Sequence, residues 1–429
     1  MKATSGVLKG RFAVVLDIII AIIAFFIFNR RTWLCLDEIN KPLFYCQYGT
    51  LQSENLVLLL LVAAALLLLW QRRELRTFFA SWKSHWLLIA FLVWAAASYF
   101  WSIDSAASLE KIPQLVLTTL LAAYFGYRFS QKRILIALFM FSFIVTALSF
   151  VLVGLLPGAA IMSTYPHEGM WRGITSHRNY LGSLAAFSSM IALMVFFRKK
   201  RLWQKLLAVA IFAGCGFLIF KSHSATGILL MAGLNLVVLL CLGWVHVWPR
   251  MKTWQKISVL AGSGAVLVLA VLNLNHIFAL VGRNSSLTGR IPLWGYLIQD
   301  VANHNLWLGY GIGSVWNMGS YMQHLADVLG WPFLVVNGHN GFVDIFVYLG
   351  LVGVLMLIAI TATVLIRSFI HFVGQKSTLS LLPFVSILYV IVANITISYF
   401  FVFETFHWAI LVCFLFAASR KTLLIENPG

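Results

Sequence analysis

Charged residues, and acidic ones above all, are scarce in this chain of 429 residues. Only 10% of the residues are charged and 13 are Asp or Glu, whereas about a quarter of a soluble globular chain is charged. Hydrophobic residues make up 61% of the chain, against about half in soluble proteins. This composition excludes a soluble enzyme, a disordered chain and a fibre.

Several sequence motifs that carry enzymatic chemistry are also missing. The chain has no Asp-x-Asp pair, no His-Glu-x-x-His, no phosphate-binding Gly-x-x-x-x-Gly-Lys and no Gly-x-Ser-x-Gly. The five cysteines show no metal-ligand spacing. We therefore expect no metal and no cofactor. Cys35 and Cys46 share one polar loop, and the sequence leaves open whether they form a disulfide.

Apolar runs of about 20 residues recur along nearly the whole chain, and each is long enough to cross a bilayer as a helix. The pattern predicts an all-α, polytopic integral membrane protein with a single transmembrane domain over residues 1–429. The twelve expected spans lie near residues 12–28, 55–70, 85–101, 112–127, 134–156, 179–197, 206–220, 226–248, 257–275, 341–366, 379–398 and 401–418.

The 31 Lys and Arg residues lie in short clusters between the apolar runs. If the N-terminus is cytoplasmic, 22 of them fall on the cytoplasmic side and 9 on the outer side, as the positive-inside rule requires. Both termini are therefore expected in the cytoplasm. Membrane topology accounts for the net charge of +18, so we expect no nucleic-acid partner.

The outer face collects histidines and the longest loop. Seven of the 11 histidines are expected there: His167, His177, His223, His276, His304, His324 and His339. The loop is residues 276–340, between spans nine and ten. Its segment 291–303 has one apolar face and predicts a helix at the membrane–water interface. Long loops of this kind often carry function.

Three outer segments, 171–182, 280–294 and 337–344, combine cations with histidine or asparagine at expected loops or helix starts. Helix N-termini favour anions, and the arginine fork matches phosphate oxygens. The segments therefore indicate a site for a phosphate-bearing ligand. Its candidate residues are Arg172, Arg178, Asn179, Lys221, Arg283, Arg290, Trp294, His339 and Asn340.

Each candidate also has a purely structural explanation. Arg172 and Arg178 could anchor helix ends among lipid headgroups, as interfacial cations often do. Lys221 lies in a short outer turn, and His339 could simply precede a helix. Arg290 fits a structural role less well, because the dipole at a helix start disfavours a cation.

The order of these motifs resembles the O-antigen ligase and O-antigen polymerase superfamily of bacterial envelope proteins. Residues 289–313, with Gly-Arg-x-x-x-Trp followed by His-Asn-x-x-x-Gly-x-Gly-x-Gly, are similar to its central signature. Residues 339–353, with His-Asn-x-Phe and Gly-x-x-Gly, are similar to its C-terminal signature. Arg-Asn-x-Leu-Gly at 178–182 resembles an earlier motif, and the resemblance extends over about 165–420.

The chain departs from this family at three places. Asn305 and Tyr348 stand where the family often has Pro and Glu. The usual Ser-Arg-Gly after span seven is Ser-His-Ser at 222–224, which removes one expected phosphate-binding arginine. Lys221 is the candidate to replace it.

The resemblance implies a metal-independent, inverting glycosyltransferase of the bacterial inner membrane with a periplasmic active site. The implied donor is undecaprenyl-diphosphate-linked O-antigen, and the implied acceptor is a sugar hydroxyl of lipid A–core. His339 then takes the acceptor proton while Arg290 and the other cations hold the diphosphate.

The sequence leaves three alternatives to an O-antigen ligase open. Two belong to the same superfamily: a repeat-unit polymerase, and an enzyme that glycosylates protein side chains. The third is a secondary transporter, which the nearly charge-free interiors of the spans disfavour.

Overall fold

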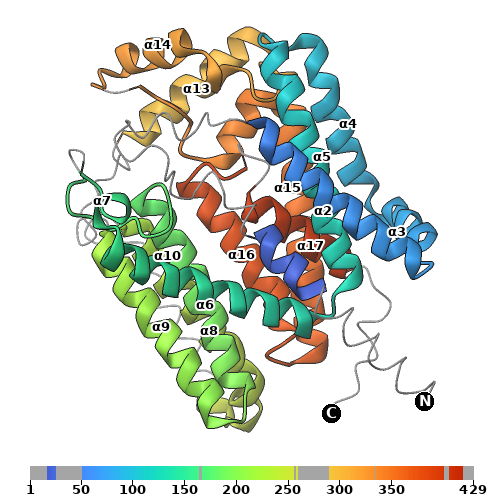
Figure 1. Ribbon diagram of the computed structural model, residues 1–429, viewed down its shortest axis with the longest axis vertical. Helices are drawn as coiled ribbons and strands as arrows, with labels where there is room; N and C mark the ends of the chain where they lie inside the picture. Colours follow the sequence, from blue (N-terminus) through green and yellow to red (C-terminus); the bar gives the residue numbers. More distant parts are fainter. Residues whose placement is uncertain are drawn as a thin grey trace.

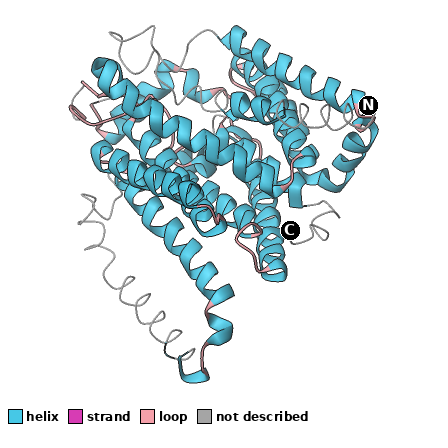
Figure 2. Ribbon diagram, turned by 60° about the horizontal axis from the view of Figure 1, so that its bottom comes forward, coloured by secondary structure: helices cyan, strands magenta, loops and turns pink. Residues whose placement is uncertain are grey.

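The computed structural model describes residues 17–25, 51–163, 167–255, 258, 289–332, 334–400 and 405–418. Within these ranges the regular elements are helices, and Figure 2 draws them as a helical assembly. The exception is an isolated antiparallel bridge between Ile161 and Trp171. The all-α prediction is therefore confirmed for the described residues. Arg283, Cys35 and Cys46 lie outside them.

The helices follow the chain in this order: α2 (Leu51–Gln71), α3 (Leu75–Ser81), η4 (Trp82–His85), α4 (Trp86–Ala97), η5 (Ser98–Trp101), α5 (Ser105–Arg128), α6 (Gln131–Leu155), α7 (Pro157–Ala160), α8 (Arg178–Arg198), α9 (Leu202–Ser222), α10 (Ala225–His246), η6 (Trp248–Arg250), α13 (Arg290–Asn305), η7 (Val315–Asn317), α14 (Gly319–Leu329), α15 (Gly341–Gln375), α16 (Leu381–Thr396) and α17 (Phe406–Ala418).

Six helical segments of the described chain are long and apolar enough to cross a membrane: Leu75–Trp101, Gln131–Leu155, Arg178–Arg198, Leu202–Ser222, Ala225–His246 and Gly341–Gln375. Three shorter apolar helices, Leu56–Gln71, Leu381–Thr396 and Phe406–Ala418, add to them. A multi-span helical membrane protein is thus confirmed. The count of twelve spans stays a prediction, because expected span 257–275 lies outside the described residues apart from residue 258.

Helix α8 is the most enclosed of the six candidate spans, with 78% of its apolar window buried inside the protein. It packs against α6, α9 and α10, the group drawn in teal to yellow-green in Figure 1. Small residues allow α8 and α10 to approach closely: a Cβ added at Gly182 would lie 2.5 Å from the side chain of Ser224. The start of α8 is therefore held closely against the start of α10.

Helices α13 and α14 lie together at one end of the molecule, at the top of Figure 1. Helix α13 buries Leu293, Leu297 and Val301, which repeat every four residues, and it packs on α15. This confirms the helix with one apolar face that the sequence predicts over 291–303. Helix α14 is an additional element of the same loop.

A backbone break interrupts α15 at Gly350, whose φ of +65° suits glycine. The loop after α13 fills the break: the N–H groups of Tyr310 and Gly311 donate to the carbonyls of Val347 and Tyr348 at 2.9 Å. A Cβ at Gly309 would lie 2.6 Å from the Val347 carbonyl oxygen. The Gly-x-Gly-x-Gly pattern therefore allows this loop to dock into a helix.

Candidate active site

The outer end of α8 begins with a capping histidine. The Nδ1 atom of His177 accepts the backbone N–H of Asn179 at 3.2 Å, so the neutral ring carries its proton on Nε2. Burial, together with smaller effects from four neighbours, lowers the pKa of His177 to about 3; the neighbours are His167, Arg178, His339 and Arg172. His177 is therefore a neutral hydrogen-bond donor at pH 7 and not a base.

The same effect indicates that two of the three predicted segments lie near each other. His339 lies close enough for its charge to act on the His177 ring. The Tyr180 ring, one turn into α8, lies 5.7 Å from the Tyr399 ring, which follows α16. The start of α8, the loop before α15 and the turn after α16 thus meet at one place.

Arg178 lies against the end of α9. Its guanidinium donates to the backbone carbonyls of Ser222, at 3.4 Å, and His223. These carbonyls belong to a helix C-terminus, where the helix dipole favours a cation. The neighbouring Asn179 accepts the hydroxyl of Ser224, the capping residue of α10, at 3.2 Å. The structure therefore joins Arg178 and Asn179 to the α9–α10 turn.

The remaining cations of this segment have defined neighbours. The Lys221 ammonium lies 5.8 Å from the ring centroids of both Trp171 and Phe217, within the range of cation–π attraction. The Arg172 Nε donates to the carbonyl of Ala159, in α7, at 2.8 Å. Both side chains are partly exposed and add positive charge beside Arg178.

Arg290 repeats the arrangement of Arg178 at a second helix end. It is the first residue of α13, and its Nη1 donates to the carbonyl of Thr396, the last residue of α16, at 2.7 Å. The guanidinium is a rigid fork with five N–H donors, so this contact also orients the rest of the group. The Thr396 carbonyl accepts a hydrogen bond from Arg290, and this contact offsets the unfavourable helix dipole at the start of α13.

The loop that carries His339 is held from several sides. The Trp294 indole donates to the Gly338 carbonyl at 2.7 Å, and the Gly338 N–H donates to the Asp344 carboxylate at 2.8 Å. The His339 N–H donates to the Asn337 side chain at 2.9 Å, while Asn340 caps α15. His339 itself has φ +50°, a strained left-handed conformation for a residue with a Cβ. These contacts fix the backbone from which the imidazole projects.

Sequence reasoning gave no role to two buried ionisable side chains: Asp344, which closes the segment 337–344, and Lys111. Asp344 is fully buried and also faces the Ser398 hydroxyl and the Trp316 indole. Lys111 of α5 is 7% exposed, donates to Gln114 at 3.3 Å and packs beside Gly313. A carboxylate in the first turn of an apolar helix was a usable signal for Asp344. Lys111 carried none, because its burial depends on the distant 306–317 loop.

Other candidate histidines belong to different surroundings. His304 stacks on Tyr310, with ring centroids 4.1 Å apart, and His324 bonds the Tyr296 hydroxyl at 2.9 Å. His223 lies 6.3 Å from the Phe220 ring and contributes its backbone carbonyl to Arg178. In the described part of the chain, no three His, Cys, Asp or Glu side chains lie close enough together to hold a metal ion.

No protein-family profile matches the chain. The chain is 26% identical over 320 residues to the exopolysaccharide production protein ExoQ of Rhizobium meliloti (strain 1021). The alignment covers 68% of this chain and 66% of that relative, so the chain spans about two thirds of the relative's length. The protein is a multi-span helical membrane protein with distant homology to an exopolysaccharide production protein.

Proposed function

We propose that the protein is a glycosyltransferase that moves a glycan from a lipid diphosphate to a hydroxyl acceptor at the outer face of the membrane. The observation that carries the proposal is the fixed loop of His339 beside the cationic start of α8. Trp294, which holds that loop, lies one helical turn from Arg290. These contacts support the assignment of His339 as the candidate base and of the nearby arginines as candidate ligands of the diphosphate.

The proposed reaction is a single displacement. The acceptor oxygen attacks the anomeric carbon, the bond from that carbon to the phosphate oxygen breaks, and the lipid diphosphate leaves. His339 takes the acceptor proton, and Arg290 with Arg178 and Arg172 stabilises the negative charge on the leaving group. Nucleotide sugars are absent outside the cytoplasm, so a donor carried by a lipid fits an outer site. The order of bond changes implies inversion at the anomeric carbon.

Two acceptors have specific support. The three motifs favour O-antigen ligation, with undecaprenyl-diphosphate-linked O-antigen as donor and lipid A–core as acceptor in the inner membrane. The similarity to an exopolysaccharide production protein favours polymerisation, in which a second lipid-linked repeat is the acceptor. The same donor site would serve both reactions, and neither alternative changes the residues assigned above.

Product analysis separates the two acceptors. The purified full chain is incubated with a lipid-linked glycan, with and without lipid A–core. The glycan of the donor carries a label. Transfer of this label to lipid A–core indicates ligation, whereas a longer lipid-linked glycan in the absence of lipid A–core indicates polymerisation. In a deletion strain, free core with accumulated lipid-linked polymer indicates a ligase, whereas a product with a single repeat indicates a polymerase. Failure of both transfers with an intact donor would contradict the proposed function.

A further inference from the structure

A second cationic site lies at the far end of α8 from the candidate active site. Helix α8 has 21 residues, so Arg178 and Arg198 are separated by about 30 Å, the thickness of a bilayer core. Near Arg198, a cavity of about 250 Å³ opens between α6, α8 and α9. This cavity faces the opposite membrane surface and is independent of the proposed transfer reaction.

The rim of this cavity is positively charged. Lys132 comes from the start of α6, Arg198 is the last residue of α8, and Lys199 follows it in the α8–α9 turn. Partial burial lowers the pKa of Lys199, and the charges of Arg198, Lys132 and Arg201 lower it as well. Among the described residues lining the cavity none is acidic. The described lining therefore supplies positive charge without a carboxylate to balance it, which favours an anion.

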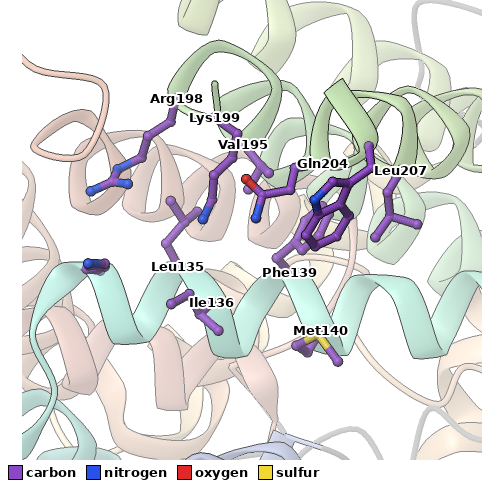
Figure 3. Close-up of a pocket in the computed structure, with 11 residues that line it drawn as sticks. Leu135, Ile136, Phe139, Met140, Val195, Arg198, Lys199, Gln204 and Leu207 are labelled. Atoms are coloured by element: carbon purple, nitrogen blue, oxygen red, sulfur yellow. The ribbon is translucent and has the colours of Figure 1, made fainter. Parts of the chain in front are cut away.

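The rest of the cavity is apolar. Figure 3 shows Lys199 and Gln204 reaching toward Leu135 and Ile136 of α6, with Leu207 on the α9 side. Trp203 is 58% exposed at the start of α9, where an indole suits the membrane–water interface. A cationic rim above an apolar wall matches a ligand with an anionic head and hydrocarbon chains.

We propose that this cavity binds the phosphate headgroup of an anionic phospholipid from the leaflet opposite the candidate active site. Basic pockets between transmembrane helices on the cytoplasmic side bind such headgroups in other membrane proteins. The cavity is smaller than a typical pocket for a whole soluble ligand, about 300–1,000 Å³, so the acyl chains extend along α6 and α9 into the bilayer. The bound lipid bridges α6 to the α8–α9 hairpin.

The test uses the full chain in detergent and native mass spectrometry with phosphatidylglycerol or phosphatidylcholine of the same chain length. Phosphatidylglycerol should bind tightly and phosphatidylcholine weakly. Each lost cation should weaken binding by about fivefold, so the double variant Lys132→Gln with Lys199→Gln should lose about 25-fold. The variant Lys132→Arg with Lys199→Arg keeps both charges and should bind phosphatidylglycerol much as the wild type does.

A matched control removes two cations from the same predicted membrane face but away from the cavity. Arg76 and Lys83 are exposed on α3 and η4, so Arg76→Gln with Lys83→Gln should leave phosphatidylglycerol binding unchanged. Equal binding of the two lipids, or an unchanged affinity in the Lys132 and Lys199 double glutamine variant, would overturn the proposal. Displacement of the lipid by millimolar inorganic phosphate would instead identify a site for a free anion and would also overturn it.

Discussion

The loop of His339 depends on one buried carboxylate, so Asp344→Ala should reduce transfer without removing a group that touches the donor. Asp344 is fully buried, and its Oδ1 accepts the Gly338 N–H at 2.8 Å. The alanine variant leaves that N–H without this acceptor. His339, at φ +50°, then loses one of the contacts that hold its strained backbone.

The size of the effect follows from this geometry. An unsatisfied buried N–H costs about 1–3 kcal/mol in the free energy of unfolding. Catalysis is more sensitive, because a shift of about 1 Å in a reacting group can reduce the rate about a hundredfold. We therefore expect Asp344→Ala to slow transfer by about that factor. Donor binding should be nearly unchanged, since Arg290 and Arg178 bond to other helix ends.

The assay measures single-turnover transfer at saturating donor, donor affinity and thermal stability on the purified protein. Asp344→Asn keeps an oxygen acceptor for Gly338 and should retain most of the rate. Asp300→Ala is the matched control: it removes an acceptor that Tyr310 and Tyr321 share at 2.9 and 2.6 Å, away from the His339 loop. Wild-type transfer by Asp344→Ala, or an equal loss in Asp300→Ala, would refute the positioning argument.

Three further predictions concern acid stability, metal dependence and orientation. The lowered pKa of His177, about 3, means that the unfolded chain gains a proton below pH 6.5 while the folded chain does not, so stability should fall as pH drops from 6.5 toward 3. His177→Asn, which can still cap α8, should flatten that fall in a series of melting temperatures, and an identical slope would contradict the assignment. Transfer should survive a strong chelator, because the sequence offers neither an acidic motif nor a ligand cluster; activity lost and then restored by a divalent ion would disprove this. A reporter active only outside the cytoplasm should be active when fused after Asn284 and inactive after Lys200, and the reverse pattern would invert the topology.

Local sequence patterns predicted the elements whose signal is periodic. The apolar repeat in 291–303 predicts α13 correctly, because its leucines and valine form one apolar face that packs on a single neighbouring surface. The glycine motif at 309–313 was visible, but its structural purpose was not. That purpose depends on the break of α15 at Gly350, which lies within a continuous apolar run predicted as one span over 341–366.

In the candidate site too, some features could be predicted from the sequence and others could not. The types of its residues could be read from the sequence, since arginine beside histidine suggests phosphate and proton chemistry. Their backbone partners could not, because Arg290 donates to Thr396 and Arg178 to the end of α9, contacts between segments distant in the chain. Arg283 lies outside the described residues, and its assignment stays a prediction.

The division of roles between Arg290 and His339 is the most direct test of the account. Arg290→Gln keeps an amide donor for the Thr396 carbonyl but removes the charge, so it should weaken donor binding. His339→Asn suits the left-handed backbone and removes the imidazole, so it should leave donor binding nearly intact. It should slow transfer by about a hundred- to ten-thousandfold.

Donor affinity and the pH dependence of the rate, measured on both variants, test whether Arg290 binds the donor and His339 acts as the base. The wild-type rate should fall in acid, because protonation removes the capacity of an imidazole to act as a base. His339→Asn should lose that fall and bind the donor normally. If His339→Asn abolishes donor binding while its residual rate keeps the wild-type pH profile, His339 is a phosphate ligand and the proposed mechanism is wrong.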